Sequence, residues 1–243
     1  MERAVTDRLV AYLELADRVC LVSEDIMAKT SEHPVGEPDT RADVLAALAL
    51  KIDGAFRALV EDCRAARAEA MHHLKTIAEA FIYFFVVAKD PSQRTAERIL
   101  ADAVAEEHLK RLRKIDGDAA EIRSWTEFRD AFRQEAGRLT YLEVLAKEHS
   151  EALHGWYGRV YRLACQPAHI ADLLLWMPDG QKIHIGPKAA RGQATIAIEY
   201  GLEIALHLLD FINQSNAIGL RVPTDDFRRS LESIRGSDEA AEA

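Results

Sequence analysis

Residues 80–88, AFIYFFVVA, form the most apolar stretch of the chain and decide its fold class. Every residue in this stretch is hydrophobic, so a helix formed here is apolar on all sides and has to be buried. A helix that crosses a bilayer needs about 20 consecutive apolar residues, and this stretch is much shorter. We therefore expect residues 80–88 to form the buried centre of a globular helical protein.

Helical periodicity continues on both sides of this stretch. Two residue pairs have the spacing of a capping box, a pattern that marks the start of a helix: Ser124 with Glu127, and Thr140 with Glu143. The predicted helices cover residues 3–28, 40–88 with a break near 62–65, 91–115, two segments that begin at about 124 and 140, 153–165, 192–215 and 224–234. Residues 176–186, WMPDGQKIHIG, break the helical period, and we expect a loop or short hairpin there. The sequence thus predicts an all-α helical bundle with one short excursion.

Length and composition predict one globular domain. The chain has 243 residues, of which 49% are hydrophobic, and this is enough for a sizeable core. We expect the domain to cover residues 1–235 and the acidic sequence GSDEAAEA, residues 236–243, to be a disordered tail. The charged N-terminus does not resemble a signal peptide, and the three widely spaced cysteines are typical of a reducing compartment. We expect a cytoplasmic protein with no membrane partner.

One part of this acidic chain is basic. The net charge of −9 disfavours non-specific attraction to nucleic acid. Residues 159–191, however, contain five lysines and arginines against two aspartates. Aromatic side chains in or next to this segment add stacking surface: Trp156, Tyr157, Tyr161 and Trp176. This segment is therefore where we expect a site for phosphate.

Arg162 and His169 form the first candidate site, within YRLACQPAH at residues 161–169. Pro167 interrupts the helix between them, so we expect one helix to end near Cys165 and another to begin at Pro167. His169 then lies in a first helical turn, where free N–H groups attract anions, and Arg162 supplies a bidentate donor for phosphate. The plainer interpretation is that Arg162 pairs with an acidic neighbour while His169 caps or packs against a helix.

Glu and His side chains three residues apart form a second candidate site, because such pairs bind the metals of di-iron and di-manganese bundles. The pairs are Glu69 with His72 and Glu151 with His154, and Glu107 and Glu203 are further candidate ligands. Such spacings also arise by accident in a chain rich in Glu and His, so solvated helix faces are the simpler interpretation. No P-loop, GxGxxG, GxSxG or HExxH pattern occurs. We expect no metal and no cofactor.

A bacterial helical family, the domain of unknown function numbered five-six-seven-seven, has a first half that residues 71–112 resemble. These residues read MHHLKTIAEAFIYFFVVAKDPSQRTAERILADAVAEEHLKRL. In that family a helix with a basic residue and a Glu in an LRSLFEA-like stretch leads to an apolar run. LKTIAEA at residues 74–80 is similar to this stretch, with Lys75 where Arg is usual and Glu79 in register.

The second half of the family is similar at residues 157–174, YGRVYRLACQPAHIADLL, so the resemblance covers about residues 40–215. The family looks related to HEPN domains, helical dimers that often act as metal-free ribonucleases in toxin–antitoxin and antiphage systems. Their signature is an Arg, then four to six residues, then a His, and Arg162 and His169 fit its longest form. In active members the residue after the Arg is usually polar, whereas here it is Leu163.

The resemblance implies a ribonuclease site at a homodimer interface. Arg162, His169 and Tyr161 would be its catalytic residues, and Lys75, Arg159 and Lys182 would bind the substrate. The implied partners are a second copy of the chain, RNA and an antitoxin or defence protein. A non-catalytic helical dimer that binds a protein or nucleotide partner is the alternative, favoured by the acidic net charge and Leu163. A di-metal carboxylate bundle is the third hypothesis.

Overall fold

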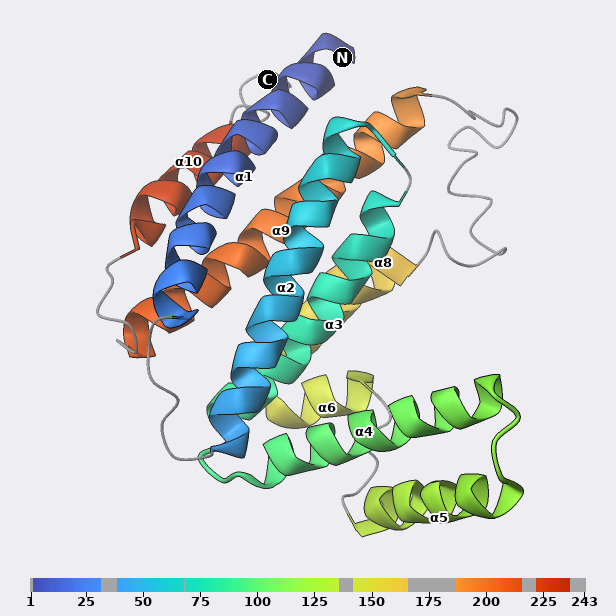
Figure 1. The fold of residues 1–243 in the computed structure, drawn as a ribbon. Helices are drawn as coiled ribbons and strands as arrows, with labels where there is room; N and C mark the ends of the chain where they lie inside the picture. Colours follow the sequence, from blue (N-terminus) through green and yellow to red (C-terminus); the bar gives the residue numbers. More distant parts are fainter. Residues whose placement is uncertain are drawn as a thin grey trace. The chain divides into compact units, whose positions relative to one another are not determined.

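A computed structural model describes residues 2–31, 39–67, 69–135, 142–165, 187–215 and 222–236. Every regular element in these ranges is a helix, which confirms the prediction of an all-α fold (Figure 1). The helices are α1 (Glu2–Ser31), α2 (Thr40–Arg64), α3 (Ala70–Lys89), α4 (Arg94–Lys114), α5 (Ala119–Glu135), α6 (Leu142–His149), α7 (Glu151–Trp156), the π-helix η1 (Tyr157–Tyr161), α8 (Arg162–Cys165), α9 (Pro187–Ser215) and α10 (Thr224–Gly236). The expected hairpin at 176–186 and the acidic tail beyond Gly236 lie outside the described residues.

The chain divides into two compact units. The first unit comprises residues 1–35, 49–81 and 158–243, and the second comprises residues 36–48 and 82–157. Each unit has its own buried side chains and is described by itself below. A single domain over residues 1–235 stays a prediction. No helix in the described part of the chain is long and apolar enough to cross a membrane.

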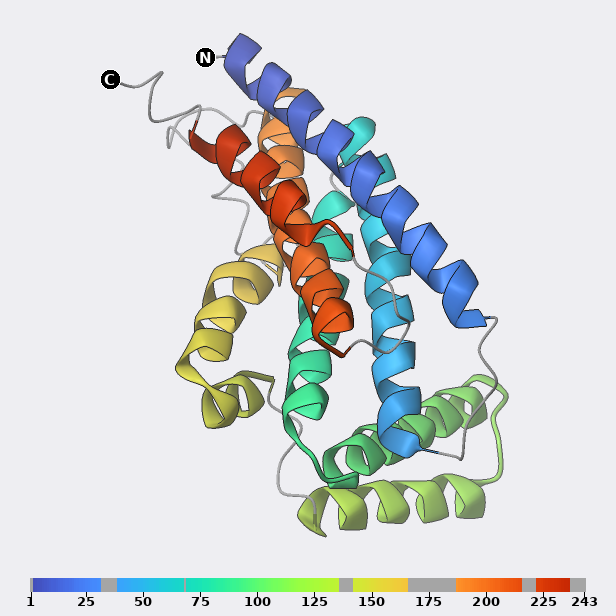
Figure 2. The same ribbon diagram turned by 90° about the vertical axis from the view of Figure 1, so that its left-hand side faces the viewer.

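The first unit is built on contacts among α1, α9 and α10, which lie side by side in both ribbon views (Figures 1 and 2). The fully buried side chains of this unit are large and mostly aliphatic: Tyr12, Ile52, Phe56, Leu59, Leu74, Ile77, Ile198, Leu202, Ile204 and Leu206. Gly201 allows α9 to approach α2 closely, because a Cβ atom there would lie 2.4 Å from Leu59 Cδ2. Burial of these apolar faces stabilises the helices far more than helix propensity does.

The second unit contains the α4–α5 pair, the α6–α7 pair and a small apolar cluster. The cluster consists of Val44, Val87 and Ala96, with Leu45, Leu48 and Ile99 packed against them. Arg41 lies beside this cluster and donates hydrogen bonds to three backbone carbonyls at the end of α3. These are the carbonyls of Val87 (3.1 Å), Ala88 (2.8 Å) and Asp90 (2.9 Å). Carbonyls in the last turn of a helix have no partner within the helix, so Arg41 caps α3.

The apolar stretch at residues 80–88 is mostly buried, in agreement with its composition. Ala80, Ile82, Val86 and Val87 are at most 1% exposed. Tyr83, Phe85 and Ala88 are half-buried, so α3 is not covered on its whole circumference. The expectation that this stretch lies at the buried centre of the fold holds for most of its side chains.

Three expected helix starts differ from the observed ones or fall outside the described residues. The α4 helix begins at Arg94 and not at Pro91, because the Asp90 carboxylate accepts hydrogen bonds from Ser92 and Thr95 in a turn that precedes the helix. The α5 helix begins at Ala119, where the Asp118 carboxylate accepts a hydrogen bond from the backbone N–H of Ala120.

Ser124, the expected cap, therefore lies inside α5 and not at its start. Thr140, the other expected cap, lies outside the described residues, and α6 is described from Leu142 onward.

Candidate functional site

Three of the sequence-predicted site residues lie on one short helical segment. Arg159 and Tyr161 belong to the π-helix η1, and Arg162 begins α8 directly after it. A π turn inserts one extra residue into a helical turn and is frequent at functional sites. Gly155 and Gly158 precede or lie within this segment, and a Cβ atom at either position would meet nothing within 4 Å. The glycines therefore loosen the backbone here without being required by close packing.

The exposed face of this segment carries two arginines. Arg159 and Arg162 are both exposed and lie three residues apart, on either side of the end of the π-helix. Val160 and Ala164 are 1% exposed and anchor the opposite face, while Tyr161 is half-buried. Neither arginine forms an ion pair with any residue that the structure describes. Both guanidinium groups therefore face solvent, and no acceptor in the described part of the chain occupies their N–H donors.

Lys75 lies on α3 and is half-buried. Its ammonium group forms no hydrogen bond or ion pair with any described residue. His169 and Lys182 lie outside the described residues. A shared cleft for Arg162 and His169 stays a prediction.

Three of the expected di-metal ligands, Glu107, His154 and Glu203, are engaged in other contacts. In the described ranges, no group of three or more His, Cys, Asp and Glu side chains is arranged to hold a metal ion. Glu203 pairs with Arg235 (2.6 Å), and Glu107 pairs with Arg111 (3.1 Å). His154 Nε2 lies 3.6 Å from the carboxylate of Glu143. These three side chains are thus paired locally.

A buried carboxylate at the connection between α2 and α3 was not predicted from the sequence. Asp62 is only 7% exposed, and its Oδ1 accepts a hydrogen bond from Arg67 (3.0 Å) while its Oδ2 lies 3.1 Å from His73 Nε2. Ala66, with a φ of 50°, forms the turn that brings Arg67 back towards Asp62. Because the three residues lie on both sides of a helix break, no helical period connects them.

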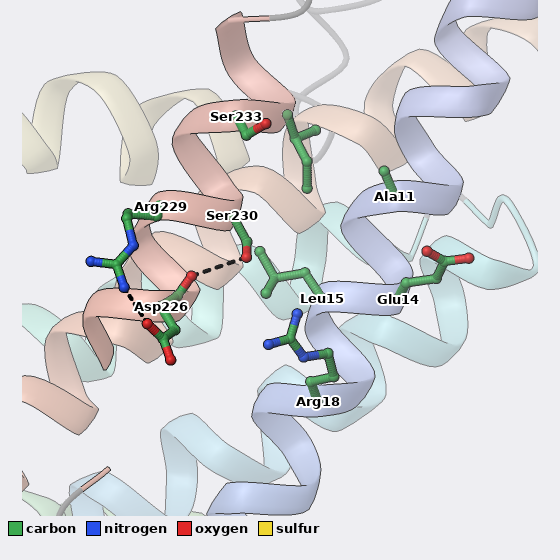
Figure 3. A pocket seen from close by; sticks show the side chains of 9 residues that line it. Ala11, Glu14, Leu15, Arg18, Asp226, Arg229, Ser230 and Ser233 are labelled. Carbon is green, nitrogen blue, oxygen red and sulfur yellow. Dashed lines mark hydrogen bonds and ion pairs between the residues drawn. The ribbon is translucent and has the colours of Figure 1, made fainter. Parts of the chain in front are cut away.

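A polar groove between α1 and α10 is the second feature that the sequence did not reveal (Figure 3). Its volume is about 520 Å³. The lining residues come from the two ends of the chain: Ala11, Glu14, Leu15, Arg18, Asp226, Arg229, Ser230, Ser233 and Ile234. The Asp226 carboxylate pairs with Arg229, and its backbone carbonyl accepts a hydrogen bond from the Ser230 hydroxyl (2.9 Å). Only the packing of α10 against α1 brings these side chains together.

No known protein family has a model that matches this chain, and no curated protein and no solved structure is significantly similar to it.

Proposed function

We propose that the chain is a metal-independent ribonuclease that binds RNA on the exposed face of η1 and α8. The observation that carries this proposal is the pair of exposed arginines, Arg159 and Arg162, which have no carboxylate partner in the described chain. An arginine that binds phosphate needs its donors free, and two such exposed groups three residues apart can contact the same RNA backbone. Their position at a π turn also supports a functional role.

The proposed reaction is attack of the RNA 2′-hydroxyl on the adjacent phosphorus, with departure of the 5′-oxygen of the next nucleotide. His169 takes the proton from the 2′-hydroxyl or gives one to the leaving oxygen, because an imidazole titrates near neutral pH. Arg162 stabilises the negative charge that develops on the phosphorane oxygens. Tyr161 and Lys75 assist by contacting the phosphate, and Arg159 and Lys182 bind flanking parts of the RNA.

Cleavage and binding of a fluorescent single-stranded RNA by the full chain, measured in EDTA, test this proposal. We expect His169→Ala to abolish cleavage while RNA binding persists, because only the proton-transfer step is lost. Arg162→Ala should slow cleavage by roughly 100- to 1,000-fold, the usual effect of removing one donor that stabilises a transition-state charge. Arg162→Lys should recover only part of the rate, since an ammonium group lacks the bidentate geometry.

Arg113→Ala provides the matched control. Arg113 is an exposed arginine on α4 that has no ion pair within the described residues, so the variant removes the same charge elsewhere. Cleavage that survives His169→Ala would contradict the catalytic proposal. Binding without any cleavage by the wild-type chain would instead establish the non-catalytic alternative, which Leu163 favours. Absence of both activities would overturn the RNA proposal as a whole.

A further inference from the structure

We propose that the groove between α1 and α10 binds a small organic anion, a carboxylate that carries a short aliphatic chain. Its volume of about 520 Å³ falls within the range of roughly 300–1,000 Å³ that is typical of small-molecule sites. The groove lies within the first unit, and none of its lining residues belongs to the proposed RNA site. The inference therefore stands independently of the ribonuclease proposal.

Arg18 supplies the positive charge of this site. The other arginines whose side chains are described on α1 and α10 each bind a carboxylate: Arg8, Arg228, Arg229 and Arg235. Arg18 has no carboxylate partner among the described residues, and its guanidinium lies 5.1 Å from the ring centroid of Phe227. Phe227 is 3% exposed, so this cation–π contact holds the guanidinium against a fixed ring. A charge that is held in place and not neutralised is suited to bind an anion.

The two acidic residues of the groove do not cancel this charge. The carboxylate of Asp226 is already paired with Arg229. The side chain of Glu14 is directed away from α10, whereas the guanidinium of Arg18 is directed towards the space between the two helices (Figure 3). The ligand carboxylate therefore meets an uncompensated guanidinium at the Arg18 end of the groove.

The other end of the groove carries the apolar side chains of Leu15, Ala11 and Ile234 beside the hydroxyls of Ser230 and Ser233, and it suits an aliphatic chain. Leu15 lies next to Arg18 along the groove, and Ala11 follows it on α1 (Figure 3). Leu15 is only 3% exposed, so it forms a fixed apolar floor. A carboxylate bound at Arg18 would direct its chain along Leu15 towards Ala11. This order of charge and apolar surface selects a monocarboxylate over a purely ionic or a purely apolar ligand.

Calorimetric titration of the full chain with acetate, butanoate, hexanoate and octanoate tests this inference. We expect affinity to rise with chain length, by up to about fourfold for each methylene group that the groove buries. Hexylamine, which has a chain of similar length but the opposite charge, should not bind. Arg18→Gln should weaken octanoate binding by about tenfold or more, because a charge-assisted hydrogen bond is lost. Ala11→Phe should weaken octanoate but not butanoate, since it fills only the far end of the groove.

Arg113→Gln removes one exposed arginine from α4 and is the control for loss of charge. Arg18→Gln removes the contact with the Phe227 ring, but because Arg18 is exposed the melting temperature of the ligand-free protein should fall only slightly. A melting temperature close to that of the wild type together with loss of octanoate binding would support the site. The inference would be overturned if Arg18→Gln left octanoate binding unchanged, or if both glutamine variants weakened it equally. It would also be overturned if hexylamine bound as tightly as the carboxylates, or if neither hexanoate nor octanoate showed saturable binding.

Discussion

At the scale of single residues, Gly201 has the clearest structural requirement in the first unit. An added Cβ atom would lie 2.4 Å from Leu59 Cδ2 and 3.4 Å from the Phe56 ring, and both of these side chains are fully buried. Gly201→Ala should therefore lower the free energy of unfolding by about 1–3 kcal/mol, the usual cost of overpacking a core. Unfolding in urea, followed by circular dichroism, measures this change.

Gly54 provides the matched control on α2. A Cβ atom there would meet nothing within 4 Å, so Gly54→Ala should raise the free energy of unfolding by about 0.5–1 kcal/mol through reduced backbone entropy. Equal stability of the two alanine variants would show that α2 and α9 are not as close as described.

His207 makes the stability of the first unit depend on pH. Burial lowers the pKa of His207 below its ordinary value of 6.5, and the positive charge of Arg228 lowers it further, while Glu203 and Asp210 act in the opposite direction. As the pH falls below about 6.5, the unfolded chain therefore takes up a proton on this residue before the folded chain does. The free energy of unfolding should decrease from that pH down to the folded-state pKa.

Chemical unfolding at a series of pH values between about 5 and 7.5 measures this effect. His207→Gln should flatten the pH dependence, because glutamine keeps a polar side chain but does not titrate. A wild-type curve and a variant curve that stay parallel over this range would show that His207 is not the responsible group.

At the scale of secondary-structure elements, Arg41 ties the start of α2 to the end of α3 in the second unit. Arg41→Ala would remove its hydrogen bonds to the carbonyls of Val87, Ala88 and Asp90. We expect the free energy of unfolding to fall by about 1–3 kcal/mol and hydrogen exchange to accelerate in the last turn of α3. Arg41→Lys should recover part of the loss. Unchanged exchange in the alanine variant would contradict the capping role.

The long helices could be predicted from the sequence because many residues contribute to their periodicity. The apolar positions of α1, α9 and α10 repeat over several turns, and all three helices lie close to where they were expected. Helix starts depend on single side chains, and there the prediction failed: Ser124 and Glu127 have capping-box spacing but lie inside α5. The spacing of two residues does not tell a cap from an ordinary helical turn.

The features of the candidate sites depend on tertiary packing and were therefore harder to predict. Arg162 is exposed, and its binding role stays a prediction. The π turn before Arg162 could not be predicted, because Gly155 and Gly158 allow this backbone conformation but do not require it. The contact between Asp62 and His73 crosses a helix break. The groove beside Arg18 combines the first and last helices of the described chain.

At the scale of the whole molecule, we predict a homodimer, because the HEPN-like arrangement proposed for Arg162 and His169 would place the site between two copies. Light scattering and sedimentation at micromolar concentration measure the assembly directly. A mass near twice the 27.2 kDa of the chain is expected. A monomer at this concentration would contradict an obligate dimer and, with it, a site shared between two copies.

The central claim is that Arg159 and Arg162 contact RNA phosphates, and the salt dependence of RNA binding tests it most directly. Each phosphate contact with a single strand contributes about 0.7 to the slope of the logarithm of affinity against the logarithm of salt concentration. The double variant Arg159→Ala/Arg162→Ala should therefore reduce the magnitude of this slope by about 1.4. The control Arg94→Ala/Arg113→Ala, which removes two exposed arginines from α4, should leave it unchanged. Equal slopes for the wild type and the Arg159/Arg162 variant would contradict the account.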